Sequence, residues 1–273
     1  MSKTILITGA SSGIGKATAK YFQEKGWNVV ATMRTPEKEE ELNQIDNIHV
    51  TKLDVQDLGS IDNAINEGIE KFGKIDVVLN NAGYGLMGPF EAASREKIQT
   101  QYDVNVFGLF DVTRAALPHF RANKDGMFIN ISSIGGRITF PLISMYHSTK
   151  FAVEGFSESL RYELEPLGIK VKIVEPGGVA TDFGGRSLDM QHDESLEDYN
   201  PMVHGMMKNM QENWDPSNMS TAEFIAESIY NAATDDSDRL RYLAGPDAEQ
   251  LMGARTQMND SEFASMIKQQ YGA

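Results

Sequence analysis

The residues of this chain best suited to chemistry are a tyrosine and a lysine four positions apart, Tyr146 and Lys150 in the stretch YHSTKFAVEGF. Residues four apart on a helix share one face, with Cβ atoms roughly 5–6 Å apart. A phenol with a pKa near 10 is a poor acid–base catalyst at neutral pH. Lowering that pKa to about 7 needs about 4 kcal/mol, which one charge about 4 Å away supplies at an effective dielectric constant of about 20. The pair is therefore either a proton-transfer site in which the lysine lowers the pKa of the tyrosine, or two neighbouring side chains on a solvent-exposed helix face.

A glycine-rich turn is the second candidate site. The stretch TGASSGIG follows a short β-branched run and opens a helix-period segment, which is the setting that a phosphate-binding turn requires. Gly9 permits a tight turn, and Gly13 lets backbone N–H groups approach a pyrophosphate beside the partial positive charge of a helix N-terminus. The alternative is a glycine-rich turn that binds nothing.

Short strands that alternate with helices must position these two sites. Seven β-branched apolar runs recur along the chain, and helix-period segments separate most of them. This alternation predicts βαβ units and a parallel sheet with helices on both faces, in a single domain over 1–273. The expected strands are 4–8, 28–32, 48–53, 75–80, 127–132, 169–174 and 241–245, and the expected helices are 14–25, 58–72, 96–122 and 151–167.

One segment breaks the alternation. Residues 184–216 contain five of the fourteen methionines, few β-branched residues and no strand pattern. Long insertions after a strand are often lids or binding loops, and methionine side chains suit an adaptable apolar wall. We therefore expect 184–216 to form a lid over a substrate.

Composition excludes several classes of function. The formal net charge of −14, from 25 basic and 39 acidic residues, argues against nucleic acid and anionic membranes as partners. Without cysteine the chain has no disulfide, no thiolate nucleophile and no Cys-ligated metal, and its five histidines show no metal-ligand spacing. It has neither a signal-peptide pattern nor about 20 consecutive apolar residues, so the expected location is cytoplasmic.

Three motifs, in this order, resemble the short-chain dehydrogenase/reductase family in its compact single-domain branch. They are G-x-x-x-G-x-G from Gly9 to Gly15, NNAG at 80–83, and the Tyr146–Lys150 pair. The resemblance runs from residue 3 to about 182. It implies a Rossmann-type, doubly wound sheet of seven parallel strands, whose carboxyl ends bring the motifs together at one crevice. It also implies a catalytic tetrad, of which every residue type is present: Asn105, Ser133, Tyr146 and Lys150.

The resemblance implies a role for each member of this tetrad. Tyr146 would give or take the proton, while Lys150 would tune the phenol and hold the hydroxyls of the nicotinamide ribose. Ser133 would hydrogen-bond the substrate oxygen, and Asn105 would anchor a proton-relay water. His147 is next to the tyrosine, but helical geometry turns it about 100° away, so we expect a packing or surface role for it.

The same resemblance implies contacts to a nicotinamide dinucleotide. Asp54 would lie near the adenine; its alternative is a helix N-cap, a role that suits Asp57 better. Thr181 would meet the nicotinamide carboxamide, with a cap before the lid helix as its alternative. The implied cofactor-binding residues are Gly9, Ser11, Ser12, Gly13, Ile14, Gly15, Arg34, Asp54, Val55, Asn81, Ala82, Gly83, Tyr146, Lys150, Pro176, Gly177, Val179 and Thr181.

The end of the second strand indicates which dinucleotide binds. NAD-binding proteins of this fold place an Asp or Glu there for the ribose 2′-OH. Here Met33 and Arg34 occupy that place, and the next acid is Glu37, beyond Pro36. A guanidinium binds a 2′-phosphate in a bidentate way, which favours NADP(H) over NAD(H). The alternative is that Arg34 is a solvated surface side chain.

Together these features predict an NADP(H)-dependent carbonyl reductase or alcohol dehydrogenase that acts on a small molecule and has no nucleic-acid or membrane partner. The stretch from 146 to 183 is similar to hydroxysteroid and retinol dehydrogenase-like members of the family, whose usual dimers or tetramers imply a homo-oligomer. Two alternatives stay open. One is a non-catalytic dinucleotide-binding regulator, which would typically lack the tyrosine or the lysine. The other is an epimerase or dehydratase that uses the same pair.

Overall fold

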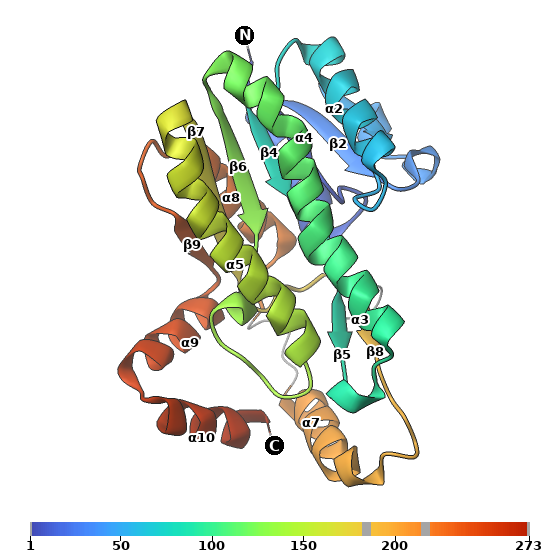
Figure 1. The fold of residues 1–273 in the computed structure, drawn as a ribbon, viewed down its shortest axis with the longest axis vertical. Coiled ribbons are helices and arrows are strands. Elements are labelled where there is room, and N and C mark those ends of the chain that lie inside the picture. Colours follow the sequence, from blue (N-terminus) through green and yellow to red (C-terminus); the bar gives the residue numbers. More distant parts are fainter. Residues whose placement is uncertain (1, 182–186, 214–218, 272–273) are drawn as a thin grey trace.

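The fold is built on a seven-stranded parallel sheet, in a computed structural model that describes residues 2–181, 187–213 and 219–271 (Figure 1). The strand order is β3-β2-β1-β4-β6-β7-β9, so the direction of winding reverses between β1 and β4. Every strand lies within two residues of its expected range, which confirms the predicted fold class. The strands are β1 (Thr4–Ile7), β2 (Asn28–Met33), β3 (Ile48–Lys52), β4 (Val77–Asn80), β6 (Gly126–Ile131), β7 (Ile169–Pro176) and β9 (Arg241–Ala244).

Helices follow most of the strands, as the sequence predicts. The helix expected at 58–72 has those bounds, because Asp57 caps its start and Gly73, in the left-handed conformation, ends it. The helix expected at 151–167 instead begins at Ser144, so that Tyr146 lies in its first turn. The helices are α1 (Gly13–Glu24), α2 (Leu58–Phe72), α3 (Arg95–Tyr102), α4 (Gly108–Asn123), α5 (Ser144–Leu164), α7 (Asn200–Asn213), α8 (Ala222–Thr234), α9 (Pro246–Gln257) and α10 (Asp260–Tyr271).

Alternating side chains bury both faces of the sheet. Successive residues of a strand point to opposite faces. Ile5 and Ile7 belong to one buried cluster, which also contains residues of α1 and α8, whereas Leu6 belongs to a second cluster with residues of α2, α4 and α5. The central strand β1 (TILI) is therefore buried along its whole length, as expected in a parallel sheet covered on both sides.

A π-helical turn joins α3 to α4. The sequence predicts one helix over 96–122, and the chain is helical over this range, but Asp103–Phe107 form a π turn. Single π turns inside α-helices often occur at functional sites. The predicted catalytic residue Asn105 is at the centre of this one.

Two short strands connect the expected lid to the body of the protein. β5 (Gly85–Met87) and β8 (Leu188–Met190) pair in parallel, with Gly85 opposite Leu188. The expectation that 184–216 contains no strand is therefore wrong, because a three-residue strand is too short to show a period of two. Helix α7 follows β8. Residues 184–186 and 214–216 of the expected lid lie outside the described residues.

The C-terminal helices α9 and α10 lie beyond the end of the sheet toward which the strands point (Figure 1). Met252 of α9 and Phe263 of α10 are buried with Ile134 and Ile138, which follow β6. This third buried cluster is separate from the two that cover the sheet. It places the end of the chain beside the loops that carry the predicted site.

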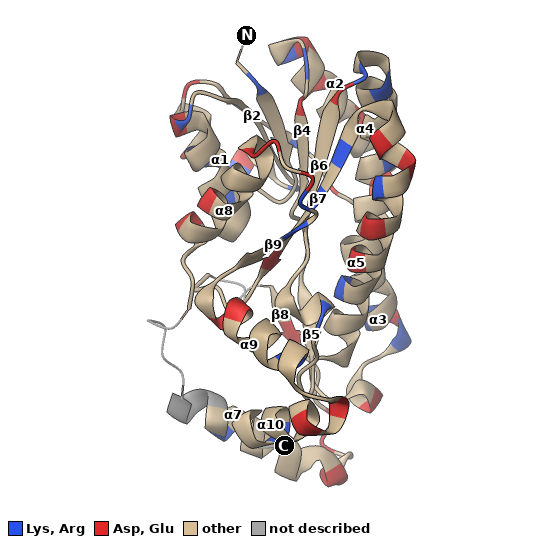
Figure 2. Cartoon of the chain, turned by 90° about the vertical axis from the view of Figure 1, so that its left-hand side faces the viewer, with Lys and Arg blue, Asp and Glu red and all other residues tan. Residues whose placement is uncertain are grey.

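Charged residues are spread over the helices and the loops, and a few occur in strands (Figure 2). Several lysines and arginines pair with the more numerous acids, for example Lys74 with Asp125 and Arg255 with Asp260. Among the described residues, no helix combines the length and the apolar character that crossing a membrane would need.

Candidate active site

A large cavity lies at the carboxyl ends of the strands, beside the place where the strand order reverses. Its volume is about 1880 Å³, whereas a small-ligand pocket typically has about 300–1,000 Å³. The cavity therefore has room for a dinucleotide and a second small molecule. The predicted site residues that line it are Gly9, Ser11, Ser12, Gly13, Ile14, Arg34, Asp54, Val55, Asn81, Ala82, Gly83, Ser133, Tyr146, Lys150, Pro176, Gly177, Val179 and Thr181.

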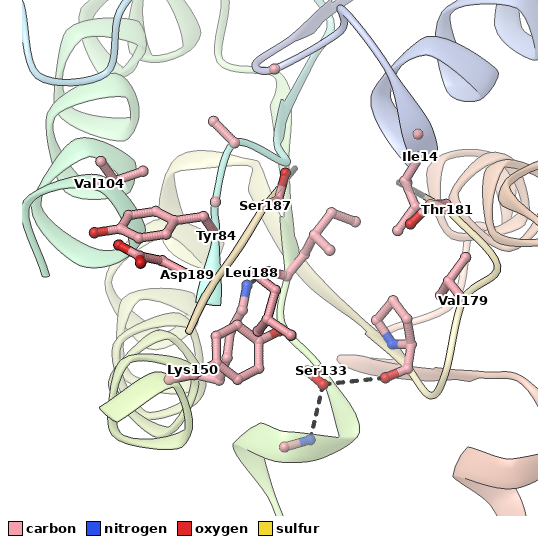
Figure 3. Close-up of a pocket in the computed structure, with 18 of the residues that line it drawn as sticks. Ile14, Tyr84, Val104, Ser133, Lys150, Val179, Thr181, Ser187, Leu188 and Asp189 are labelled. Atoms are coloured by element: carbon pink, nitrogen blue, oxygen red, sulfur yellow. Dashed lines mark hydrogen bonds between the residues drawn. The ribbon is translucent and has the colours of Figure 1, made fainter. Parts of the chain in front are cut away.

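The remaining two predicted residues, Gly15 and Asn105, are buried behind this lining. Figure 3 shows the two sides of the cavity: Tyr84, Lys150 and Ser133 lie on one side, and Ile14, Thr181 and Val179 on the other. The topology thus brings together residues that are more than 150 positions apart in the chain.

The glycine-rich turn has the shape that a pyrophosphate site needs. Gly9 and Gly13 have φ angles of 71° and 53°, in the left-handed region that favours glycine. A Cβ atom on Gly15 would lie 2.4 Å from the carbonyl oxygen of Gly9 and 2.6 Å from Nδ2 of Asn81, so only glycine fits there. The first turn of α1 has no acidic side chain, and its N-terminus faces the cavity with partial positive charge. These features fit a bound anion.

Asn105 fixes the loop that follows β4. Its Oδ1 accepts a hydrogen bond from the backbone N–H of Tyr84 (3.0 Å), and its Nδ2 donates to the carbonyl oxygen of Tyr84 (2.8 Å). Nδ2 also donates to Oγ1 of Thr149 on α5 (3.1 Å). The side-chain amide is therefore occupied by protein groups, and it connects the π turn to both the NNAG loop and the helix of Tyr146.

Ser133 occupies a short turn at the end of β6. Its Oγ accepts a hydrogen bond from the N–H of Gly135 (3.0 Å) and donates one to the carbonyl oxygen of Pro176 (3.4 Å), as Figure 3 shows. It also forms a hydrogen bond with the hydroxyl of Tyr146. The serine thus joins the ends of β6 and β7 to the tyrosine.

Tyr146 and Lys150 lie on the same face of α5, and both line the cavity. Nζ of Lys150 is 5.6 Å from the centre of the Tyr146 ring and donates a hydrogen bond to the carbonyl oxygen of Ile131 (2.8 Å). Burial lowers the pKa of Lys150 to about 8, although the nearby charge of Glu154 opposes this shift. The predicted pairing on one helix face is therefore present.

The expected effect on the phenol is not present in the protein alone. Burial raises the pKa of Tyr146 to about 12, and the hydrogen bond with Ser133 only partly offsets this rise. The ring keeps some surface open to the cavity, but the protein atoms around it still penalise a phenolate. In the protein alone burial acts on both groups, and Nζ of Lys150 donates to the carbonyl oxygen of Ile131. A bound oxidised nicotinamide would add a second positive charge beside the phenol, so the lowering of the Tyr146 pKa by Lys150 stays a prediction for the protein with its cofactor.

His147 has a structural role, in agreement with the sequence. It is buried, its Nδ1 lies 2.7 Å from the carbonyl oxygen of Gly135, and its Nε2 accepts a hydrogen bond from the N–H of Phe140 (3.0 Å). Burial lowers the pKa of its imidazole. The histidine therefore holds the loop between β6 and α5.

The two aspartates after β3 have different roles in the structure. Asp57 is the N-cap of α2, since its carboxylate accepts hydrogen bonds from the N–H groups of Gly59 and Ser60. Asp54 instead lines the cavity, and its Oδ1 accepts from the N–H of Gln56 (3.1 Å). The capping role that was the alternative for Asp54 thus belongs to Asp57.

The cavity wall after β2 contains an ion pair that the sequence did not indicate. Met33 is buried with 3% of its surface exposed, while Arg34 is exposed at the cavity wall together with Lys38. Glu39 also lines the wall, and its Oε1 accepts hydrogen bonds from Nζ of Lys16 (2.9 Å) and the N–H of Leu42 (2.9 Å). This acid is therefore paired within the protein. Its role was not visible in the sequence, because Lys16 and Glu39 are 23 positions apart.

The lining also includes apolar side chains from four different segments, namely Phe140, Leu188, Met206 and Leu251. Leu188 and Met206 belong to the expected lid. Within residues 2–181, 187–213 and 219–271, no group of three or more His, Asp or Glu side chains is placed to hold a metal ion.

Comparisons with known proteins identify the family of this chain. The pattern of the short chain dehydrogenase family matches residues 3–192. The chain belongs to this family. An uncharacterised oxidoreductase of Schizosaccharomyces pombe is 40% identical over 243 residues, which cover 88% of this chain and all of the relative. The crystal structure of a short-chain dehydrogenase from Streptomyces avermitilis has a TM-score of 0.81 and 32% identity, with 97% of each chain covered.

Solved members of the short-chain dehydrogenase family bind nicotinamide dinucleotides. ElxO, in a structure with NADP bound, has a TM-score of 0.74 and 28% identity, and covers 92% of this chain and 100% of its own. A 3-ketoacyl-(acyl-carrier-protein) reductase from Brucella melitensis, complexed with NADH, has a TM-score of 0.72 and 25% identity over 89% of this chain and 97% of its own. The chain is therefore an oxidoreductase of a family whose members use either dinucleotide.

Proposed function

We propose that this oxidoreductase transfers a hydride between NADP(H) and a carbonyl or secondary alcohol, with Tyr146 as the acid–base group. The observation that supports the proposal best is the cluster of Tyr146, Ser133 and Lys150 on the wall of a cavity that the glycine-rich turn also lines. An acid, a hydrogen-bond donor and a cation thus converge beside an anion-binding turn. This is the set of groups that carbonyl reduction needs.

Tyr146 would give its proton to the carbonyl oxygen. With a pKa of about 12 in the protein alone, the phenol holds the proton that reduction needs at neutral pH, and a nearby positive charge would ease its release. Ser133 would donate a second hydrogen bond to the same oxygen when its one hydroxyl hydrogen turns away from the carbonyl oxygen of Pro176. In the reverse direction the phenol must first lose its proton, and the positive charge of Lys150 against its ring favours that loss.

The residues of the cavity fit a dinucleotide in one orientation. The turn from Gly9 to Gly15 would hold the pyrophosphate, Arg34 the 2′-phosphate and Asp54 the adenine end. Val179 and Thr181 would hold the nicotinamide end, and Lys150 the hydroxyls of its ribose. When bound, the nicotinamide supplies or accepts the hydride. The apolar side chains of the lining then suit a substrate with an apolar body.

The lid over 184–216 belongs to this proposal as well. Leu188, Asp189 and Met206 line the cavity from β8 and α7. Among its described residues, β8 pairs with the three-residue strand β5, Asp189 pairs with Lys97 (2.5 Å), the Tyr199 hydroxyl donates to Glu91 (3.1 Å), and α7 packs against α10. A segment that lines a binding cavity and pairs with the sheet region through short elements is suited to open and close.

Limited proteolysis tests the lid. In the protein without ligand, we expect the first cleavage to fall within 184–216, because local opening of a weakly anchored segment exposes its backbone to the protease. Addition of NADPH with a carbonyl compound that the protein reduces should slow this cleavage more than cleavage elsewhere. Equal cleavage rates with and without these ligands would argue against a lid.

We also propose a homo-oligomer that forms through α4 and α5. Exposed aromatic side chains lie along these helices: Phe107 (49%) at the end of the π turn that leads into α4, and Phe151 (45%) and Tyr162 (69%) on α5. Phe110 and Phe156 stack between them, with ring centres 4.1 Å apart. Aromatic side chains grouped on two adjacent helices are typical of protein–protein interfaces.

Absorbance of NADPH gives the first test of the proposed activity. The protein would be mixed with NADPH and a panel of ketones and aldehydes, and with NADP⁺ and the matching alcohols. We expect carbonyl-dependent oxidation of NADPH with at least one compound that has an apolar body. Binding of NADPH without any turnover across a broad panel would favour the non-catalytic regulator.

A further inference from the structure

Two buried glutamates lie directly behind the proposed catalytic residues. Glu154 is on α5, one turn beyond Lys150, and Glu175 is near the end of β7. Only 4% of Glu154 and 1% of Glu175 is exposed to solvent. Neither glutamate lines the cavity, and the proposed reaction does not use them.

Both carboxyl groups bind the same guanidinium. Nε of Arg241 lies 2.8 Å from Oε2 of Glu154 and 3.5 Å from Oε1 of Glu175. Oε1 of Glu175 also accepts a hydrogen bond from Nη1 of Arg137 (3.0 Å). A third acid, Glu158, binds Nη2 of Arg241 (2.5 Å), but 48% of its side chain is exposed to solvent. The two buried carboxyl groups therefore lie side by side.

The other oxygen of each buried carboxyl group has no donor. Oε1 of Glu154 and Oε2 of Glu175 are buried without a hydrogen-bond partner among the described residues. A buried charged oxygen without a donor is strongly disfavoured. A shared proton would remove one of the two charges, because a protonated carboxyl group donates to a neighbouring carboxylate, and a hydrogen bond with Glu154 contributes to the raised pKa of Glu175.

We propose that Glu154 and Glu175 share one proton at neutral pH and below, and that this proton holds the loops that carry Ser133 and Lys150 in place. The pair is thus a positioning element that responds to pH. This pH response is a property of the protein alone and does not depend on which substrate or cofactor it binds.

The electrostatic surroundings support a shared proton. Burial, followed by the negative charge of Glu154, raises the pKa of Glu175 to about 7, although Arg137 opposes the rise. The other charged groups that face the pair are Arg241 from β9, and Glu158 and Lys150 from α5. Two carboxyl groups in one site seldom ionise together, and one of them then titrates at a strongly raised pKa.

Each partner of the pair is joined to a proposed catalytic residue. Glu175 precedes Pro176, whose carbonyl oxygen accepts the hydrogen bond from Ser133. Arg137 ends the short turn that Ser133 begins. A Cβ atom on Gly136 would lie 2.9 Å from Cγ of Glu154 and 3.1 Å from the carbonyl oxygen of Lys150, so these groups are tightly packed. Loss of the proton would make two buried carboxylates repel each other within this packing.

The pH dependence of stability tests the shared proton. Between pH 4.5, the ordinary pKa of a glutamate, and about 7, the folded protein holds a proton that the unfolded chain has released. Stability from this proton is therefore present below pH 4.5 and is lost as the pH rises to about 7. We expect the unfolding equilibrium constant of the wild type to rise about tenfold per pH unit over this range, relative to Glu175→Gln.

Matched variants make the test specific. Glu154→Gln should reduce the slope, since the charge of Glu154 no longer raises the pKa of Glu175 and an amide donor replaces the shared proton, although Glu175 stays buried. Glu158→Gln removes an exposed acid from the same Arg241 and should keep the slope of the wild type. If both buried variants keep the wild-type slope, or if Glu158→Gln also loses it, the shared proton is ruled out.

Hydrogen exchange tests the positioning role. At pH 6 the segments 131–137 and 172–178 should exchange equally fast in the wild type and in Glu175→Gln, after correction for the intrinsic rate. At pH 8.5 we expect exchange in these segments of the wild type to be at least several-fold faster than in the variant. If the wild type and Glu175→Gln exchange at equal rates at pH 8.5 as well as at pH 6, the proton does not hold these loops.

Discussion

Replacement of Tyr146 by phenylalanine is expected to lower turnover at least a hundredfold while fold and NADPH binding stay intact. The change removes only the hydroxyl, which in the proposed mechanism gives its proton to the carbonyl oxygen. Loss of a general acid typically lowers the rate by about 10²–10⁴-fold. The measurement is kcat for reduction of one carbonyl compound, with the unfolding midpoint and the Kd for NADPH as checks.

Tyr84→Phe is the matched control for this change. Tyr84 also lines the cavity, and its ring lies beside Asp189 in Figure 3, but its hydroxyl makes no hydrogen bond to a described residue. We expect this variant to keep its turnover within a few-fold of the wild type. If Tyr146→Phe retains more than a tenth of wild-type turnover while the chemical step limits the rate, the assignment of Tyr146 is wrong.

Arg34→Ala is expected to weaken the preference for NADPH over NADH by about ten- to a hundredfold. The guanidinium is exposed at the cavity wall after β2, where it would meet the 2′-phosphate. A hydrogen bond to a charged group contributes about 1.5–3 kcal/mol, and each 1.4 kcal/mol is a factor of ten. The comparison is kcat/KM with each cofactor at one fixed salt concentration, because salt screens exposed charges.

Two further variants show whether this effect is local. Lys38→Ala removes the second cation at the same wall and should have a smaller effect, because Lys38 lies farther along the chain from the end of β2. Lys52→Ala removes an exposed cation that does not line the cavity and should leave the cofactor ratio unchanged. An unchanged ratio in Arg34→Ala, or a wild type that prefers NADH, would refute the choice of NADP(H).

The strands and most helices could be predicted because their signals are local. An apolar, β-branched run favours a buried strand whichever strand it pairs with. Helix α2 has the expected bounds because Asp57 caps its N-terminus and Gly73 caps its C-terminus. The order of the motifs along the chain then determined which loops meet at the carboxyl ends of the strands. For the same reason nearly all predicted site residues line one cavity.

Features that depend on distant partners could not be predicted. The π turn at Asn105 accompanies its hydrogen bonds to Tyr84, 21 positions away. The pairing of β5 with β8 joins segments about 100 positions apart, and neither strand is long enough to show a pattern. The raised pKa of Tyr146 in the protein alone could not be predicted, because the sequence shows the nearby lysine but not the burial of both groups.

Transfer of deuterium from NADPH labelled at C4 of the nicotinamide is the most direct test of the proposed function. The protein would be incubated with each C4-labelled stereoisomer and a carbonyl compound, and the product analysed by mass spectrometry. The proposal predicts that one stereoisomer gives an alcohol with a single deuterium on the former carbonyl carbon, and that Tyr146→Phe gives at least a hundredfold less. An epimerised or dehydrated product without deuterium, or bound NADPH that never transfers its label, would contradict it.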